Sequence, residues 1–249
     1  MKKGKRIVAG ILGVILFLAP VIFFDGMTGE PVGKANAARR AEAYAEALYP
    51  GQTFHVSGVV YDGPFVFRAE VQSHERRDTH FSVTTAFYLR TSDEDEHGTG
   101  DHDRLVESGW NTLFRMGEEA ADLAAAVIRL KLPELELVPL YGVGQRRVFI
   151  ELGYEEGAEL IEKAGGYKEL IERDASFDPA LLSEIPAHFS AVVQWDGVPT
   201  ESDAEDVLAK IRAVLEENGL PMSYYSITLW PGGDEPSVST GTVRAENIG

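Results

Sequence analysis

The residues with the clearest potential for chemistry form an acidic stretch, TSDEDEHGTGDHD, at 91–103. A calcium-binding EF-hand loop needs acidic or polar ligands at positions 1, 3, 5 and 9, a glycine at position 6 and a bidentate glutamate at position 12. With Asp93 at position 1, these positions up to 9 are held by Asp95, His97, Gly98 and Asp101. Arg104 occupies position 12, so a solvated acidic loop explains the stretch better, and weak calcium binding stays the alternative.

A second group of polar residues recurs at alternate positions of three predicted strands. If the strands pair as a meander, one surface holds His55, Arg68, Glu70, His80 and Tyr88. Such a surface can bind a peptide or a glycan. It is also what the solvent-facing side of any antiparallel sheet looks like, and we favour that simpler interpretation.

Two further motifs have both a functional and a structural interpretation. His80 could be a metal ligand or a general base, but a structural hydrogen bond at the start of a strand is the favoured role. Trp110, Asn111 and Thr112 are expected to cap or pack a long helix.

The sequence contains none of the common catalytic signatures. G-x-S-x-G, S-x-x-K, the P-loop and H-E-x-x-H are all missing, and Gly142-Val143-Gly144 does not meet the dinucleotide-binding fingerprint. We therefore assign no catalytic, cofactor-binding or metal-binding residue, and expect no cofactor. The alternative is a hydrolase that uses a pair of carboxylates, which the many acidic residues permit without indicating it.

Composition narrows the class of protein. The 249 residues include no cysteine and have a formal net charge of −17. The missing cysteine excludes thiol catalysis, Cys-ligated zinc and disulfides. The negative charge repels phosphate backbones, so nucleic acid is not an expected partner.

The N-terminus predicts a membrane anchor within residues 1–33. An uncharged apolar stretch covers about 7–24, close to the ~20 residues that a spanning helix needs. Lys2, Lys3, Lys5 and Arg6 precede it, which predicts a cytoplasmic N-terminus and an extracytoplasmic remainder. The alternative is a secreted protein cleaved after Ala37, because Ala35-Asn36-Ala37 is an A-x-A pattern.

The next segment, 34–91, predicts an N-terminal α-β-β-β domain. An Ala-rich helix is expected at 34–48, ended by Pro50-Gly51. Apolar alternation predicts strands at 53–61, 64–73 and 78–90. The inward positions of the last two strands are Phe65, Phe67, Ala69, Val71, Phe81, Val83, Phe87 and Leu89.

Residues 102–249 predict a second domain, and the fold class is α+β with an N-terminal transmembrane helix before the two units. The expected elements are a helix at 103–130 that Gly109 and Gly117 could divide, a hairpin at 132–152 across YGVGQ, mixed helix at 155–184, strands at 188–195 and 222–230, and an edge strand near 238–245. A helix between the two strands starts with a Ser202–Glu205 capping box and ends at Gly219, which allows a parallel crossover.

The stretch YPGQTFHVSGVVYDGPFVFRAEVQSHERRDTHFSV, after an apolar segment and a short helix, resembles the YfjL-like family of Gram-positive membrane-anchored proteins. The matching residues are Tyr49, Pro50, Gly51, Phe54, Val56, Tyr61, Asp62, Ala69, Val71, Ser73, Asp78, Thr79, His80 and Phe81, with Trp110, Asn111, Thr112 and Arg115 in the following helix. The resemblance covers roughly 1–120. It implies an anchored extracytoplasmic α+β domain, and no activity or catalytic residue.

The expected function is therefore a non-catalytic binding or accessory module at the cell envelope. Its expected partners are the lipid bilayer, through residues 7–24, and an envelope protein or ligand that the sequence does not name.

Overall fold

The computed structural model describes residues 31–248 except 88, 95–99, 141–145, 156–165 and 234, together with 16, 18–21, 23, 24, 27 and 29. The chain divides into two compact units, Met1–Glu107 and Ser108–Gly249. Within the described residues, no helix has the length and apolar character needed to cross a bilayer. Most of the predicted span at 7–24 lies outside these residues, so the transmembrane helix stays a prediction.

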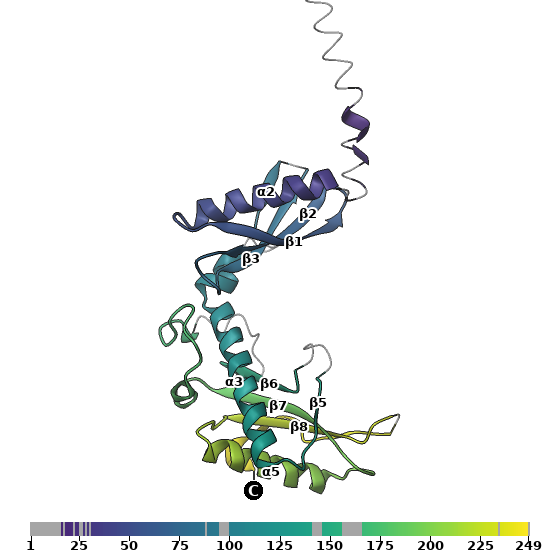
Figure 1. Cartoon of the computed structure of the whole chain (residues 1–249), viewed down its shortest axis with the longest axis vertical. Coiled ribbons are helices and arrows are strands. Elements are labelled where there is room, and N and C mark those ends of the chain that lie inside the picture. The colour runs from purple at the N-terminus through teal and green to yellow at the C-terminus, as the bar shows by residue number, and fades with distance from the viewer. Residues whose placement is uncertain are drawn as a thin grey trace, which may run out of the picture. The chain divides into compact units, whose positions relative to one another are not determined.

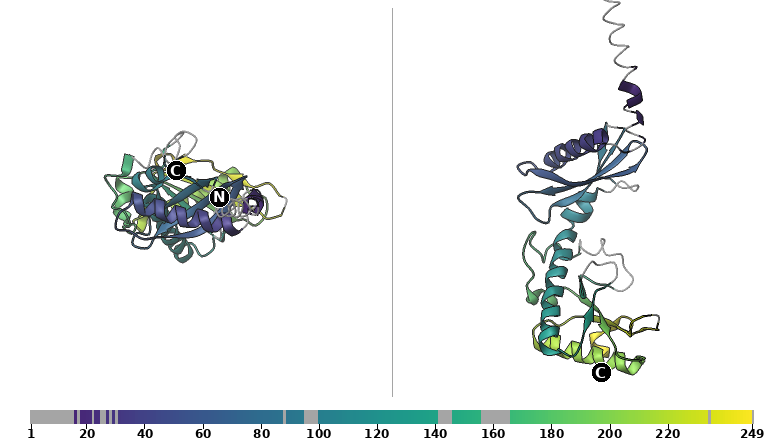
Figure 2. Two further views of the ribbon diagram at one scale, coloured as in Figure 1. Left: turned by 90° about the horizontal axis from the view of Figure 1, so that it is seen from above. Right: turned by 45° about the vertical axis from the view of Figure 1, so that its right-hand side comes forward.

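The N-terminal unit is one helix on a four-stranded antiparallel meander (Figures 1 and 2). Its elements are α2 (Pro31–Leu48), β1 (Phe54–Gly63), β2 (Val66–Ser73), β3 (His80–Ala86), β4 (Arg90–Ser92) and the π-helical η1 (His102–Glu107). Small residues at every fourth position of α2, namely Gly33, Ala37, Ala41 and Ala45, are buried against the sheet. They permit close approach: a Cβ on Gly33 would lie 2.2 Å from the Phe67 ring.

The alternation in the strands sets which side chains enter this core. Phe67, Ala69, Val71, Phe81 and Val83 are at most 1% exposed, as their spacing predicts.

Phe87 and Leu89 were predicted to share that apolar face, and this is wrong, whereas Phe65, also predicted there, is half-buried in the turn before β2. Phe87 and Leu89 are 67% and 74% exposed. The predicted strand at 78–90 ends at Ala86, where the chain turns into β4, and alternation does not continue through a turn.

The boundary between the units also differs from the predicted start at residue 102. Residues 102–107 belong to the N-terminal unit, because Val106 is 2% exposed within its core and Glu107 accepts a hydrogen bond from the Tyr49 hydroxyl at 3.0 Å. The helix predicted at 103–130 is divided near Gly109, which has φ 82° and precedes α3.

The C-terminal unit packs two long helices, α3 (Trp110–Lys131) and α5 (Glu201–Glu217), on one sheet (Figure 1). The strands are β5 (Leu137–Val138), β6 (Val148–Leu152), β7 (Ala187–Gln194), β8 (Tyr224–Trp230), β9 (Val238–Ser239) and β10 (Val243–Arg244), with 3-10 turns η2 (Pro179–Ser183) and η3 (Ala245–Asn247). β7 and β8 are parallel and joined through α5, which confirms the predicted crossover. Both units are mixed α and β.

Residues 132–152 do not form the predicted hairpin. β5 and β6 both run antiparallel to β7 along the same edge, with Val138 opposite Val192 and Val148 opposite Ala191. A hairpin would make β5 and β6 antiparallel to each other. Here both strands run in the same direction and continue one another along β7, because their facing ends pair with the consecutive residues Val192 and Ala191. Between the two strands, Leu140 N donates a hydrogen bond to Arg146 O at 2.7 Å.

The start of α5 also differs from prediction, while its end agrees. Thr200 is the N-cap and forms the capping box with Asp203, so the predicted Ser202–Glu205 box is displaced by two residues. Gly219 ends the helix with φ 76°, and Leu220 N donates to Leu215 O at 2.9 Å in a Schellman arrangement.

Candidate functional site

The open face of the four-stranded sheet, on the side away from α2, is the candidate binding surface. The register places Arg68 opposite Thr84, Glu70 opposite Ser82, and Gln72 opposite both His80 and His55. Arg68, Glu70 and His80 are exposed, and His55 is half-buried. The structure therefore brings together four of the five residues predicted for this surface; the fifth, Tyr88, lies outside the described residues.

Several of these side chains are fixed by their neighbours. Ser82 Oγ donates to Glu70 Oε1 at 2.7 Å, and Arg68 pairs with Asp62 at 3.1 Å on the rim. The rings of His55 and His74 lie 4.6 Å apart at the other end of the face. The surface thus presents positive and negative side chains beside imidazole rings. This mixture suits recognition of a polar polymer better than recognition of a ligand that carries charge of only one sign.

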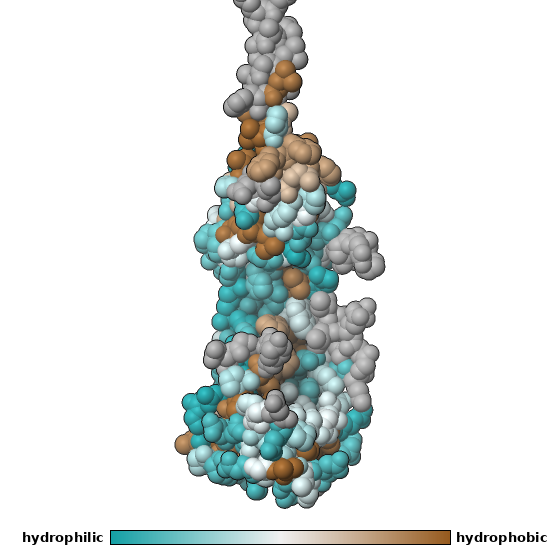
Figure 3. All heavy atoms as spheres, turned by 90° about the vertical axis from the view of Figure 1, so that its right-hand side faces the viewer, coloured by the Kyte–Doolittle hydropathy of each residue, from teal (hydrophilic) through white to brown (hydrophobic). Residues whose placement is uncertain are grey.

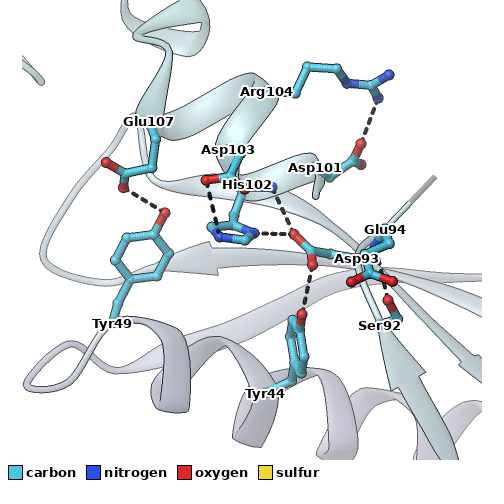
Figure 4. A network of polar contacts seen from close by, with 10 residues as sticks. All are labelled: Tyr44, Tyr49, Ser92, Asp93, Glu94, Asp101, His102, Asp103, Arg104 and Glu107. Carbon is cyan, nitrogen blue, oxygen red and sulfur yellow. Dashed lines mark hydrogen bonds and ion pairs between the residues drawn. The ribbon is translucent and has the colours of Figure 1, made fainter. Parts of the chain in front are cut away.

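A second feature is the polar network around Asp93, where β4 and the loop after it meet α2 (Figure 4). Asp93 is 5% exposed and accepts hydrogen bonds from the Tyr44 hydroxyl at 2.7 Å, the His102 backbone N–H at 2.8 Å and His102 Nδ1 at 2.5 Å. An ionised carboxylate only accepts hydrogen bonds, so Nδ1 is the protonated nitrogen of this ring when Asp93 is charged.

The network changes the pKa of three side chains: it is lowered for Asp93 and raised for Tyr44 and Asp101. Burial raises the pKa of Asp93, but the hydrogen bonds from His102 and Tyr44 and the His102 charge outweigh it and lower the pKa overall. Burial and the hydrogen bond to Asp93 raise the pKa of Tyr44 to about 12. Burial raises the pKa of Asp101 despite Arg104, whose guanidinium lies 2.6 Å away.

These contacts bear on the calcium hypothesis for residues 91–103. Asp93 and Asp101, two of the candidate ligands, are engaged with protein partners rather than solvated as the acidic-loop interpretation supposed. Asp95, His97 and Gly98 lie outside the described residues. Among the described residues, no group of three or more His, Asp or Glu side chains is arranged to hold a metal ion.

The remaining predicted residues have the following positions. His80 is the first residue of β3 and is exposed, while Asp78 and Thr79 before it are buried. Asn111 and Thr112 are buried in the first turn of α3, and Trp110 packs against the core of the C-terminal unit.

Sequence reasoning missed an aromatic cluster on the face of the C-terminal sheet opposite α3 and α5. The Tyr154 ring lies 4.6 Å from His188 and 4.9 Å from Tyr224, and His188 Nε2 is 2.9 Å from Ser226 Oγ. Burial lowers the pKa of His188 to about 4, so the imidazole is neutral at pH 7. The alternation of β7 and β8 was the available signal, since their outward positions hold His188, Tyr224 and Ser226.

A groove of about 620 Å³ lies between α5 and the C-terminal tail, and it was also missed. Its lining includes the apolar Leu208 and Val243 and three carboxylates, Glu201, Glu205 and Asp206. None of these three carboxylates forms an ion pair with a described residue, so the groove is negatively charged. No sequence motif marks it, because its walls are distant in the chain.

The family profile described as YfjL-like, N-terminal domain matches residues 4–95. The N-terminal unit is similar to the YfjL-like N-terminal domain. The YfjL-like match includes the whole open sheet face and Asp93, and it ends before His102. The resemblance noted for 109–119 lies beyond it and stays a prediction.

Comparison with curated proteins gave no match. Among solved structures, a crystal structure of a DUF5037 family protein from Ruminococcus gnavus ATCC 29149 is 12% identical to the chain, over 78% of this chain and 73% of that one. Its TM-score is 0.22, which is too low to support an inference about fold or function.

Proposed function

We propose that the protein is a membrane-anchored, extracytoplasmic binding or accessory module at the cell envelope, without catalytic activity. The observation that carries the binding role is the open sheet face of the YfjL-like unit. Helix α2 packs on one side of the meander, while Arg68, Glu70 and His80 are exposed on the other in one continuous register. Tethering such a face to a membrane raises its local concentration near envelope partners.

Anchoring, rather than secretion after Ala37, is supported by the position of that residue. Ala37 is fully buried within α2. Cleavage there would remove Pro31–Ala37 from the folded unit, including the Gly33 contact with Phe67. The folded unit therefore uses residues that cleavage would discard, which favours an uncleaved chain.

The alternative hydrolase is not favoured by the polar network. A catalytic carboxylate pair needs one acid with a raised pKa next to a second carboxylate that is free to act. Asp101 has a raised pKa but is held by Arg104, and Asp93 is fully engaged by Tyr44 and His102.

The binding role is tested by photo-crosslinking in the native host. A photoreactive residue at Thr84, on the open face, should give a specific adduct, whereas one at Ala47, exposed on α2, should not. The charge reversal Arg68→Glu should reduce the adduct. Equal adducts at both positions, or no effect of the reversal, would contradict a site on this face.

The location is tested by fractionation of the host with a C-terminal tag on the protein, followed by N-terminal sequencing of the tagged product. The expected result is the uncleaved chain in the membrane fraction. A soluble product that starts at Ala38 would replace anchoring with secretion.

A further inference from the structure

The two hairpins of the YfjL-like unit end side by side and carry large apolar side chains, which are half-buried at Phe65 and exposed at Phe87 and Leu89. Phe65 lies in the β1–β2 turn, and Phe87 and Leu89 lie in the β3–β4 turn. Phe87 N donates to Phe65 O at 2.9 Å, so the two tips are tied together. Their rings stack, with centroids 5.6 Å apart and planes at 15°.

The β3–β4 tip is exposed to solvent although its side chains are apolar, and both tips have a backbone conformation that is unfavourable for phenylalanine. Phe65 and Phe87 have φ of 61° and 49°, the left-handed region that bulky residues rarely adopt. Phe87 is 67% and Leu89 74% exposed. Contiguous exposed apolar side chains on a folded unit indicate an interaction surface.

The apolar N-terminal segment joins the same surface. The Phe23 ring lies 5.7 Å from Phe65, and the Tyr61 hydroxyl donates to Met27 O at 2.6 Å. Gly29, with φ 72°, has no room for a Cβ, which would lie 2.5 Å from the Tyr61 ring. The segment therefore leaves the unit at the hairpin tips, where hydrophobic surface gathers in Figure 3.

Arginines flank the tips in a protein that is acidic as a whole. Arg40 donates to Leu89 O and, at 3.1 Å, to Thr91 Oγ1, and Arg90 is exposed directly after Leu89. Apolar and aromatic side chains beside cationic ones are typical of surfaces that lie in the lipid headgroup region. A second copy of the chain fits less well, since a two-fold contact would bring the same arginines together.

We propose that Phe65, Phe87 and Leu89 insert into the membrane interface beside the anchor, and that Arg40 and Arg90 face lipid phosphates. Contact with the bilayer at the tips would then fix the orientation of the open sheet face relative to the membrane, in addition to tethering the unit there. This inference rests on the proposed anchoring of the chain.

The test uses the full chain in vesicles that contain anionic lipid. Because the protein has no cysteine, the variants Leu89→Cys and His74→Cys each carry a single nitroxide label. His74 is exposed at the β2–β3 turn, the opposite end of the sheet, and is the matched control. Collisions of the label with a water-soluble nickel complex should be several-fold fewer at position 89 than at position 74.

A further variant, Phe87→Asn with Leu89→Cys, removes the ring while keeping a residue that tolerates positive φ. It should fold as well as the parent and return the label at position 89 toward the exposure of the control. If the parent label at position 89 is as exposed as the control while the protein stays on the vesicles, the proposed insertion of the tips into the membrane is overturned. The proposed anchor is then unaffected.

The other outcomes are equally decisive. A protein that washes off the vesicles overturns the anchor together with the tip contact. Protection at position 89 accompanied by spin–spin broadening overturns the lipid assignment in favour of a second copy.

Discussion

The carboxylate of Asp93 joins three parts of the N-terminal unit that are distant in the chain. It accepts from Tyr44 on α2 and from the backbone and ring of His102 on η1, while it follows β4 itself. Removing a buried charged acceptor leaves its donors unsatisfied, which costs about 1–3 kcal/mol. The acidic loop therefore has a structural role at its base.

We predict that Asp93→Asn destabilises the N-terminal unit by about 1–3 kcal/mol at pH 7. Hydrogen exchange of amides in β3 of the full chain measures this. Asp103→Asn is the control, because the Asp103 side chain is 63% exposed, and it should change stability by less than about 0.5 kcal/mol. Equal effects would show that Asp93 has no special role.

The pH dependence of this difference has a definite sign. The pKa of Asp93 in the folded chain is below its ordinary value of 3.8, so the stability that Asp93 contributes is present above pH 3.8 and is lost as pH falls through the folded pKa. The difference between parent and variant should accordingly shrink below about pH 4.

A second residue-scale prediction concerns His188. Its pKa is lowered from 6.5 to about 4 by burial, so the unfolded chain binds a proton more readily between these values. Stability that is complete above pH 6.5 should decline by at most about 3 kcal/mol as pH falls toward 4. All three tryptophans lie in the C-terminal unit, so their emission follows its unfolding.

His188→Asn, which retains a polar group near Ser226, should remove that decline. The same pH profile in parent and variant would assign the decline to another group.

At the scale of elements, α5 provides a direct test of which residue caps it. Thr200 accepts from Asp203 N at 3.2 Å, whereas the sequence pattern indicated Ser202. Thr200→Ala should cost about 1 kcal/mol in denaturant unfolding followed by tryptophan emission. Ser202→Ala should stay within about 0.5 kcal/mol, and the reverse order would restore the cap predicted from sequence.

The sheet elements show where local pattern stops being informative. Alternation identified β1, β2, β3, β7 and β8, because the period of two is a property of each strand alone. It did not identify the partner of β5 and β6, which is β7 for both. Pairing with β7 joins residues between 35 (Leu152 with Ala187) and 56 (Leu137 with Val193) positions apart. A turn motif such as YGVGQ is compatible both with a hairpin and with a loop between two segments that pair with the same strand.

At the scale of the whole molecule, each unit encloses its own core. The N-terminal core is built from α2, the first three strands and Val106, and the C-terminal core from α3, α5 and the second sheet. Among the described residues, the buried apolar side chains of the two units form two separate clusters, so we expect each unit to unfold as a separate cooperative step.

We therefore predict that Asp93→Asn, which weakens the N-terminal unit, leaves the tryptophan-monitored unfolding midpoint of the full chain unchanged. The parent chain under the same denaturant is the reference. A shifted midpoint would mean that the two units unfold together.

The tripeptide His-Phe-Ser occurs in both units, at 80–82 and 188–190. Comparing the two copies shows which properties the sequence determines by itself and which depend on the tertiary structure. In β3 and in β7 the sequence alone determines that phenylalanine points inward, and Phe81 and Phe189 are at most 1% exposed. It does not determine the surroundings of the histidine. His80 is exposed, whereas His188 is covered by Tyr154 and Tyr224 and its pKa is lowered to about 4.

The same division holds for the candidate surfaces. Composition, alternation and the apolar stretch at 7–24 predicted an α+β chain with a polar sheet face and an anchor, because these depend on neighbouring residues. The Asp93 network, the paired phenylalanine tips and the acidic groove were decided only by the tertiary structure. Each requires side chains from separate elements to meet, and burial and hydrogen bonding depend on that meeting rather than on local sequence.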